Sequence, residues 1–403
     1  MKKLTIKLAF FIFHHILCNK LREIITNTLK LNMKKITTSL LVFVGLSIHT
    51  FAQQKEGIDI SLMDQTVRPQ DDFYNYVSGN WMKTAKIPSD KPTWGSFNQL
   101  AEDTDNNSLL ILNNILTETF PAGSEGRKIQ DLYASYTNLS KRNKEGIQPI
   151  ASKIKQIDAI KTMADLQHYL ISVTKDGDNT LYGWGVYADL KDSNMNAVYL
   201  GEATLGLGRD YYQKENEKNT EALTEYQRYI ASMLKELGYK NADKTAQSIL
   251  AFEKKIANTY LTNEQVRDAT LQYNPATMAE LAGLVKNVNL PEYLKKVGVN
   301  TDQVIIGELN YYKNFDQLFQ TKHLPVIKDY LKFHLINESA PYLSEKLDDM
   351  RFNFYGKYLR GQQEQRALNK RAFQVIDGTL GEAFGKLYVE KYFPAADKAK
   401  VLD

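Results

Sequence analysis

Three histidines follow residue 52, and their spacing decides whether the chain could perform metal chemistry: His168, His323 and His334. Zinc hydrolases present two imidazoles four residues apart on a helix, with a glutamate beside the first that activates a zinc-bound water. None of the six histidines in the whole chain is followed by glutamate, so this motif is absent. We therefore assign no catalytic residue, no substrate-binding residue and no metal ligand in this chain.

One histidine does have a carboxylate at helical spacing. His334 and Glu338 lie four residues apart on an expected helix and could share a cation. The sequence offers no third ligand, however, and a histidine on a helix face explains the same pattern. His168 is interpreted in the same way, as a surface or half-buried helix residue.

Three acidic pairs are interpreted as helix caps and solvated faces rather than acid–base pairs: Asp71-Asp72, Glu102-Asp103 and Asp348-Asp349.

Other catalytic motifs are incomplete or missing. Gly206-Leu207-Gly208 begins like a dinucleotide-binding loop, but it lacks the third glycine and a surrounding βαβ unit. No Walker loop and no Gly-x-Ser-x-Gly elbow occurs in the chain. The single cysteine is Cys18. The sequence after residue 52 therefore has no disulfide framework, no cysteine-based zinc site and no thiol nucleophile.

Charge is distributed unevenly between the first 52 residues and the remainder. The chain holds 51 Lys and Arg and 47 Asp and Glu, of which eight basic residues and one acid, Glu23, fall in residues 1–52. The remainder, with 43 basic and 46 acidic residues, is close to neutral and has no basic stripe. This balance argues against nucleic acid as a partner.

The uneven charge marks a targeting segment. Met33-Lys34-Lys35 precedes an apolar run from Ile36 to Phe51, and Ala52 follows at a plausible cleavage point. This pattern is typical of a secretory signal peptide. We assign residues 33–52 to a signal peptide and residues 1–32 to an upstream extension. The alternative is an uncleaved anchor at 36–51, although that run is short for a span of ~20 residues. The protein is expected to be exported, to a periplasmic, cell-envelope or extracellular location.

The elements that would position any site are mainly α-helical. Asp71 or Asp72 can cap a short helix that ends at Gly79, and a longer helix is expected over 97–117. Thr162 with Asp165, and Thr277 with Glu280, have the spacing of capping boxes. A further helix is indicated by apolar residues at helical spacing: Leu223, Tyr226, Ile230, Met233 and Leu237.

Two signals end one helix and begin the next. Gly238 closes the helix that contains Leu223, and Asn241 can cap its successor. The exception to the helical pattern is residues 181–202, where two β-prone runs flank the turn-like Lys191–Asn194. A β-hairpin is therefore expected at 181–202.

Several motifs, taken in order, indicate kinship with a known family. Arg68–Trp81 and Trp94–Phe97 resemble the start of the ectodomain in neprilysin-like zinc metalloendopeptidases, which include the endothelin-converting enzymes and bacterial PepO oligopeptidases. The resemblance continues through Leu205–Tyr212 and Arg267-Asp268 and ends with Leu380–Phe393. Each motif alone is weak, but their shared order is specific. The resemblance covers the chain from about Asp59 to its last residue.

The resemblance implies a two-domain, mainly helical peptidase whose N-terminal lobe roofs a chamber that admits short peptides. In family members the catalytic lobe carries His-Glu-x-x-His and binds zinc, so zinc belongs to the complete family protein and no cofactor is expected in this chain. Residues 53–403 would be the N-terminal helical domain, truncated before the zinc-binding domain. Asp397–Asp403 looks like the first turns of an unfinished helix. The implied partners are the C-terminal catalytic domain and short peptide substrates.

Some positions depart from the family pattern or need a structural role. Mammalian members hold a peptide's C-terminal carboxylate with arginines, and the matching positions here resemble Thr93 and Ala101. The resemblance therefore implies an endopeptidase preference without this carboxylate clamp. Apolar surface is expected around Trp94, Phe97 and Phe384. Four charged residues are expected to be structural and paired with one another: Arg209, Asp210, Arg267 and Asp268.

Three hypotheses follow from the sequence. The first is the substrate-gating lobe of an exported zinc metalloendopeptidase that is catalytically complete only with the His-Glu-x-x-His half. The second is a stand-alone exported helical module that binds peptides or proteins without catalysis. The third, an unrelated helical scaffold, is disfavoured by the ordered motifs.

Overall fold

The computed structural model describes residues 58–402, so the expected upstream extension (1–32) and signal peptide (33–52) lie outside the described residues. The chain divides into two compact units at the Lys86–Ile87 junction. No described helix combines the length and the apolar character that crossing a bilayer requires.

The described part of the first unit is a short 3₁₀ helix, η1 (Ile60–Leu62), followed by α2 (Phe73–Thr84). Asp72 caps α2 as expected, because its carboxylate accepts from the Asn75 backbone N–H at 2.9 Å. The prediction that Gly79 ends this helix is wrong. Gly79 lies inside α2, where a Cβ would fall 2.6 Å from the Asp64 Cβ, so the residue is needed for close packing rather than for termination.

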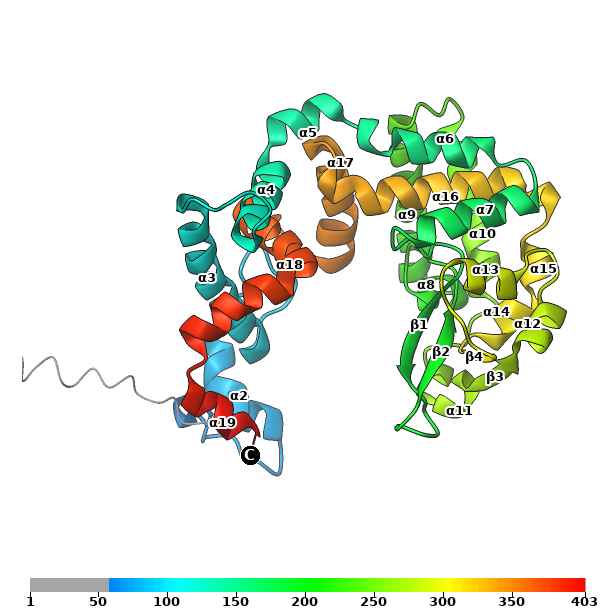
Figure 1. Cartoon of the computed structure of the whole chain (residues 1–403). Helices are drawn as coiled ribbons and strands as arrows, with labels where there is room; N and C mark the ends of the chain where they lie inside the picture. The colour runs from blue at the N-terminus through cyan, green and yellow to red at the C-terminus, as the bar shows by residue number, and fades with distance from the viewer. Residues whose placement is uncertain (1–57, 403) are drawn as a thin grey trace, which may run out of the picture. The chain divides into compact units, whose positions relative to one another are not determined.

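The second unit contains most of the helices, and Figure 1 shows their succession along the chain. The first five are α3 (Ser96–Thr117), α4 (Glu125–Thr137), α5 (Leu139–Glu145), α6 (Ala151–Ala159) and α7 (Met163–Thr174). The next six are α8 (Arg209–Gln213), α9 (Glu217–Glu236), α10 (Ala242–Ala257), α11 (Ala269–Gln272), α12 (Met278–Leu284) and α13 (Leu290–Lys296). The last six are α14 (Leu309–Lys313), α15 (Phe315–Leu318), α16 (Leu324–Ser339), α17 (Glu345–Arg351), α18 (Leu368–Tyr392) and α19 (Ala395–Leu402). Short 3₁₀ turns are η2 (Gln148–Ile150), η3 (Gln265–Arg267), η4 (Thr321–His323) and η5 (Ala340–Tyr342), and η6 (Phe352–Tyr358) is a π-helix.

The sequence signals for several helices are confirmed. The helix expected over 97–117 is α3, and both capping boxes form with reciprocal bonds, Thr162 with Asp165 and Thr277 with Glu280. Gly238 follows α9 with a φ of 85°, a left-handed conformation that glycine adopts without steric cost. Asn241 precedes α10 as expected, but its side chain makes no capping hydrogen bond.

The hairpin expected at 181–202 is also confirmed, and it belongs to a larger sheet. Strands β1 (Gly183–Ala188) and β2 (Asn196–Gly201) pair antiparallel. β2 then pairs in parallel with β4 (Gln303–Ile306), which pairs antiparallel with β3 (Asn274–Thr277), in the order β1-β2-β4-β3. The mainly α fold with a small sheet agrees with the fold class expected from the sequence.

Two apolar cores hold the second unit. The larger one lies among α6–α17 and the sheet, and α9, α10 and α16 pack against one another within it. The smaller one joins α3, α4 and α18 through Ile111, Leu112 and Ile129 with Phe373 and Phe384. Apolar residues at helical spacing thus determine which face of each helix is buried.

Candidate functional site

The histidines do not form a metal centre. His334 is 2% exposed, and its Nε2 lies 2.8 Å from Glu253 Oε1, whereas Glu338 is exposed. The imidazole of His334 thus contacts Glu253 rather than Glu338, which agrees with the favoured interpretation of a helix-face histidine rather than with the alternative of a shared cation. His168 is exposed on α7, as expected, and His323 Nδ1 lies 2.8 Å from the Leu318 carbonyl oxygen. Within residues 58–402 no three His, Cys, Asp or Glu side chains converge as metal ligands would, so these residues do not fit a zinc site.

Glu253 is the centre of a fully buried polar cluster. Besides His334, its carboxylate accepts hydrogen bonds from the hydroxyls of Tyr212 at 2.7 Å and Tyr226 at 3.0 Å. Burial and the adjacent Glu253 carboxylate raise the pKa of both tyrosines well above the usual value, which keeps the hydroxyls protonated as donors. These donors offset the cost of burying an acid. The cluster therefore fixes α8, α9, α10 and α16 together rather than offering a reactive group to solvent.

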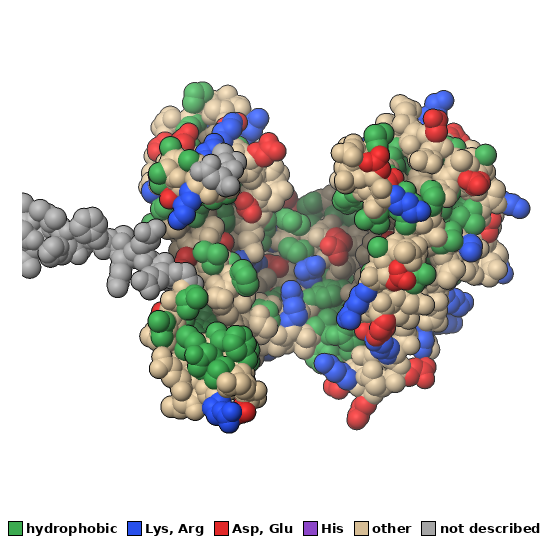
Figure 2. All heavy atoms as spheres, turned by 90° about the horizontal axis from the view of Figure 1, so that it is seen from below, with side chains coloured by type: hydrophobic (Ala, Val, Ile, Leu, Met, Phe, Trp, Pro, Cys, Tyr) green, Lys and Arg blue, Asp and Glu red, His purple; other side chains and the backbone are tan. Residues whose placement is uncertain are grey.

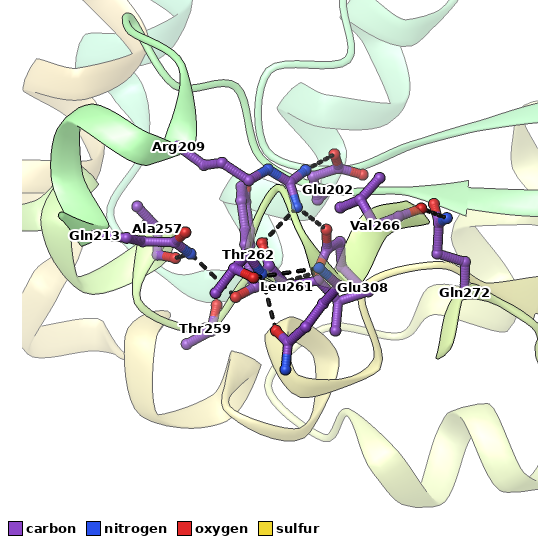
Figure 3. Close-up of polar contacts among 12 residues, drawn as sticks. Glu202, Arg209, Gln213, Ala257, Thr259, Leu261, Thr262, Val266, Gln272 and Glu308 are labelled. Carbon is purple, nitrogen blue, oxygen red and sulfur yellow. Dashed lines mark hydrogen bonds and ion pairs between the residues drawn. The ribbon is translucent and has the colours of Figure 1, made fainter. Parts of the chain in front are cut away.

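Arg209 is the centre of the second polar network, drawn in Figure 3. Its Nη1 donates to the Leu261 carbonyl oxygen at 2.7 Å and to Glu308 Oε1 at 2.6 Å, and its Nη2 lies 3.8 Å from Glu202 Oε1. Glu308 also accepts from the Leu261 backbone N–H at 2.7 Å. Burial, together with the neighbouring Glu308, raises the pKa of Glu202, although Arg209 opposes this shift. The network joins the start of α8 to the loops after α10 and β4.

Three of the four charged residues singled out from the sequence make structural contacts, but they do not pair with one another as expected. The fourth, Arg267, is exposed at the end of η3. Arg209 pairs with Glu308 and Glu202, as described above, and Asp210 pairs with Lys214 at 3.2 Å. Asp268 instead accepts from the backbone N–H of Thr270, at 2.9 Å, and caps α11. Sequence reasoning missed Glu308 because an acid 99 residues downstream of Arg209 gives no local signal.

Two of the acidic pairs interpreted as solvated faces contribute ion-pair centres instead. Glu102 Oε2 on α3 lies 2.8 Å from Lys91 Nζ, and its other oxygen pairs with Lys370 of α18. Asp348, 5% exposed on α17, pairs with Arg371 of α18. The interpretation of Glu102 and Asp348 as solvated is therefore wrong, because both are largely covered by helix packing that the local sequence does not reveal.

The first turns of α3 carry exposed apolar side chains. Phe97 is 86% exposed and Leu100 is 63% exposed, whereas Ile111 and Leu112 of the same helix are buried in the smaller core. The expectation of exposed apolar surface thus holds for Phe97 but is wrong for Phe384, which is 2% exposed.

Thr93 and Ala101 are also exposed, Thr93 just before α3 and Ala101 on it. Neither uncharged side chain can form an ion pair with a carboxylate. Phe384 is buried because its ring packs 5.0 Å from that of Phe373 on the same kinked helix, α18.

The surface charges are mixed. On the face drawn in Figure 2, Lys and Arg side chains alternate with Asp and Glu side chains and with apolar areas, without a broad basic region among the described atoms in view. Such a surface exerts little long-range attraction on polyanions.

Comparison with known proteins gives a consistent result. Residues 69–403 match the sequence model described as peptidase family M13. The chain is 24% identical over 338 residues to the neutral endopeptidase of Lactococcus lactis subsp. cremoris, across 83% of this chain and 54% of that protein. It is 28% identical over 356 residues to endothelin-converting enzyme 1 of Bos taurus, across 84% of this chain and 46% of that enzyme. The chain therefore spans about half the length of the curated relatives it matches.

Solved structures agree with these sequence matches. The inhibitor complex of the Mycobacterium tuberculosis zinc metalloprotease Zmp1 superposes with a TM-score of 0.79 at 28% identity, across 86% of this chain and 53% of that one. PepO from Lactobacillus rhamnosis HN001 superposes with a TM-score of 0.73 at 20% identity, across 83% and 54%. The PepO match shows a shared fold.

Proposed function

The chain belongs to peptidase family M13, the neprilysin and PepO family of zinc metalloendopeptidases, and from this premise we propose that it forms the substrate-gating part of an exported enzyme that hydrolyses short peptides. The observation that carries the proposal is the family match over residues 69–403. Hydrolysis would then require zinc ligands from a catalytic half that corresponds to the unmatched part of the relatives, because the described residues do not fit a zinc site.

The exposed apolar residues at the start of α3 support the proposal that this chain packs against a separate catalytic half. Phe97 and Leu100 present apolar surface that a solvated helix would not need. We propose that this face contacts the catalytic half, with peptides reaching the zinc through the space that the two halves enclose. The specificity would not depend on a C-terminal carboxylate, because Thr93 and Ala101 carry no charge, and this favours endopeptidase action.

The zinc requirement can be tested directly. Residues 53–403 alone are expected to retain no stoichiometric zinc and to hydrolyse no peptide. The chain joined to a downstream His-Glu-x-x-His half is expected to cleave peptides, and a chelator should abolish the activity. Activity of the chain alone that a chelator removes would overturn the assignment of zinc to the other half.

The gating role needs a separate measurement. The joined enzyme should cleave a short peptide but not an unfolded protein that contains the same cleavage sequence, because the longer chain cannot enter the enclosed space. Equal cleavage of both substrates would contradict gating. Peptide binding by the chain alone, with no gain of activity on joining the catalytic half, would instead support a stand-alone binding module. Export is tested by fusing residues 33–52 to a reporter and locating it.

A further inference from the structure

A cavity of about 300 Å³ is bordered by α17, η6 and the start of α18. We call it the arginine cavity because its lining includes four arginines: Arg351, Arg360, Arg366 and Arg371. The lining includes a single acid, Asp348. Three tyrosine rings complete much of the wall: Tyr136, Tyr342 and Tyr355. The excess of basic over acidic side chains distinguishes the lining of this cavity from the polar networks described above.

Only part of this positive charge is neutralised by the protein. Arg371 pairs with Asp348, and Arg366 pairs with Asp105 at 2.5 Å. Arg351 and Arg360, in contrast, form no ion pair with any acid among residues 58–402. Two of the four lining arginines, the half-buried Arg351 and the exposed Arg360, therefore have no ion-pair partner in the described part of the chain.

Three of the lining arginines also have a guanidinium Nε without an acceptor. The Nε groups of Arg351, Arg366 and Arg371 are each buried and contact no hydrogen-bond acceptor within the described part of the chain. A buried guanidinium donor without an acceptor is costly, and a charged acceptor placed there forms strong, short hydrogen bonds. Oxygen atoms carrying negative charge are the groups that satisfy both conditions.

The backbone holds these groups in place. η6 follows Arg351 directly, and π-helical segments are rare and frequently occur at functional sites. Within it, a Cβ on Gly356 would fall 2.5 Å from the Phe352 ring, so the turn packs too tightly for a side chain. The Arg351 guanidinium lies over the Tyr355 ring, 5.1 Å from its centroid, and Arg360 Nε donates to the Tyr355 carbonyl oxygen at 2.9 Å. The arginines are thus oriented before any ligand arrives.

We propose that the arginine cavity is an oxyanion-binding site, which takes a carboxylate or a phosphate group through Arg351 and Arg360, the two lining arginines without an ion pair among residues 58–402. Planar guanidinium groups match both oxyanions in geometry and charge. The site is independent of zinc and of hydrolysis, so it stands whether or not the gating function is correct. The oxyanion could be the acidic side chain of a peptide or a free inorganic anion, and the test below separates the two sources.

The test measures binding to the full chain by isothermal titration calorimetry at constant ionic strength. The probes are inorganic phosphate and an acetylated, amidated triglutamate peptide, with the triglutamine peptide as its uncharged match. Arg351→Gln is the informative variant, because Arg351 has no ion pair to lose within residues 58–402. Arg228→Gln is the control, since that side chain is 70% exposed on α9, away from the cavity lining. Circular dichroism confirms that each variant is folded.

The wild-type chain should bind at least one of the two anionic probes and not triglutamine. Arg351→Gln should weaken that binding by about tenfold, the effect of losing one charge-assisted hydrogen bond, and Arg228→Gln should leave it unchanged. Binding of the peptide alone would identify an acidic peptide as the source, and binding of phosphate would identify a free anion. If Arg351→Gln does not fold, Arg360→Gln replaces it. Failure of both probes to bind, or equal binding by the cavity variant and the control, would overturn the proposal.

Discussion

The hydroxyl of Tyr226 occupies the space that a side chain on residue 206 would need, because a Cβ built on Gly206 falls 1.6 Å from the Tyr226 oxygen. The same hydroxyl donates to Glu253 at 3.0 Å. The first glycine of the Gly206–Gly208 sequence is thus required by packing against α9 and its buried carboxylate. The need to accommodate Tyr226, rather than a dinucleotide, therefore explains the glycine at position 206.

Gly206→Ala is therefore expected to lower the free energy of unfolding by about 2–3 kcal/mol, since the added methyl must displace Tyr226. Gly208→Ala is the matched control, because its Cβ meets nothing closer than a Tyr211 ring carbon at 3.9 Å, and it should change the free energy by less than about 1 kcal/mol. Urea unfolding followed by circular dichroism gives both values. Equal stability of the two variants would contradict this account.

Arg142 should tolerate no conservative replacement. Its buried guanidinium donates to three carbonyl oxygens, those of Leu343 at 2.7 Å, Tyr136 at 2.9 Å and Pro341 at 2.6 Å. Lysine cannot reach all three from one ammonium group, so Arg142→Lys should destabilise the protein by about 2–4 kcal/mol. Arg127→Lys, at an exposed i,i+4 pair with Asp131, should cost less than about 0.5 kcal/mol. Thermal and urea unfolding would measure the difference, and similar losses would show that the three bonds contribute little.

Glu102 should make stability depend on acid pH. Burial alone would raise its pKa, but hydrogen bonds from Lys370 and Lys91 lower it from 4.5 to about 2. A carboxyl whose pKa is lower in the folded state stabilises the fold above pH 4.5 and loses that contribution as pH falls towards 2. Solvent screening of this partly exposed carboxylate reduces the contribution to about 1–2 kcal/mol at neutral pH.

The Glu102→Gln variant should accordingly be less stable than the wild type at pH 7, and the difference should shrink between pH 4.5 and pH 2. Urea unfolding across this range measures it, with Asp103→Asn as the control on the exposed side of the same helix. A difference between wild type and Glu102→Gln that stays constant with pH would show that Glu102 does not titrate in this way.

The exposed face of α3 should make the isolated chain associate. Phe97→Ser removes a ring that is 86% exposed, so it is expected to reduce self-association with little change in the free energy of unfolding. Light scattering across a concentration series checks this, with Leu271→Ser as a control at a less exposed apolar position on α11. A wild-type chain that remains monomeric at high concentration would argue against this face as a docking surface.

Local sequence signals predicted the helices and the hairpin well. Capping residues act over three or four positions, so Thr162 with Asp165 and Thr277 with Glu280 could be identified directly. The hairpin depends on adjacent runs joined by a turn. Strands β3 and β4 were not anticipated, because each has only four residues and pairs with a distant partner.

The polar networks were far less predictable. Glu253 and His334 are separated by 81 residues, and Arg209 and Glu308 by 99, so their pairing depends on tertiary packing. The arginine cavity also depends on tertiary packing, because α4 contributes Tyr136 and the segment from α17 to α18 contributes the arginines. The sequence indicated that charged residues were structural, but not which residues they would meet.

The parallel pairing of β2 with β4 sets an order of events during synthesis. β1 and β2 can pair as soon as both have left the ribosome. The other edge of β2 pairs with β4, which is synthesised only after the segment from α8 to α13. During that interval the nascent hairpin exposes unsatisfied backbone groups that can pair with another chain. Completion of the sheet is therefore a late, high-contact-order step. A chaperone that shields the open edge of β2 should increase the yield of folded protein more than one that binds the helices.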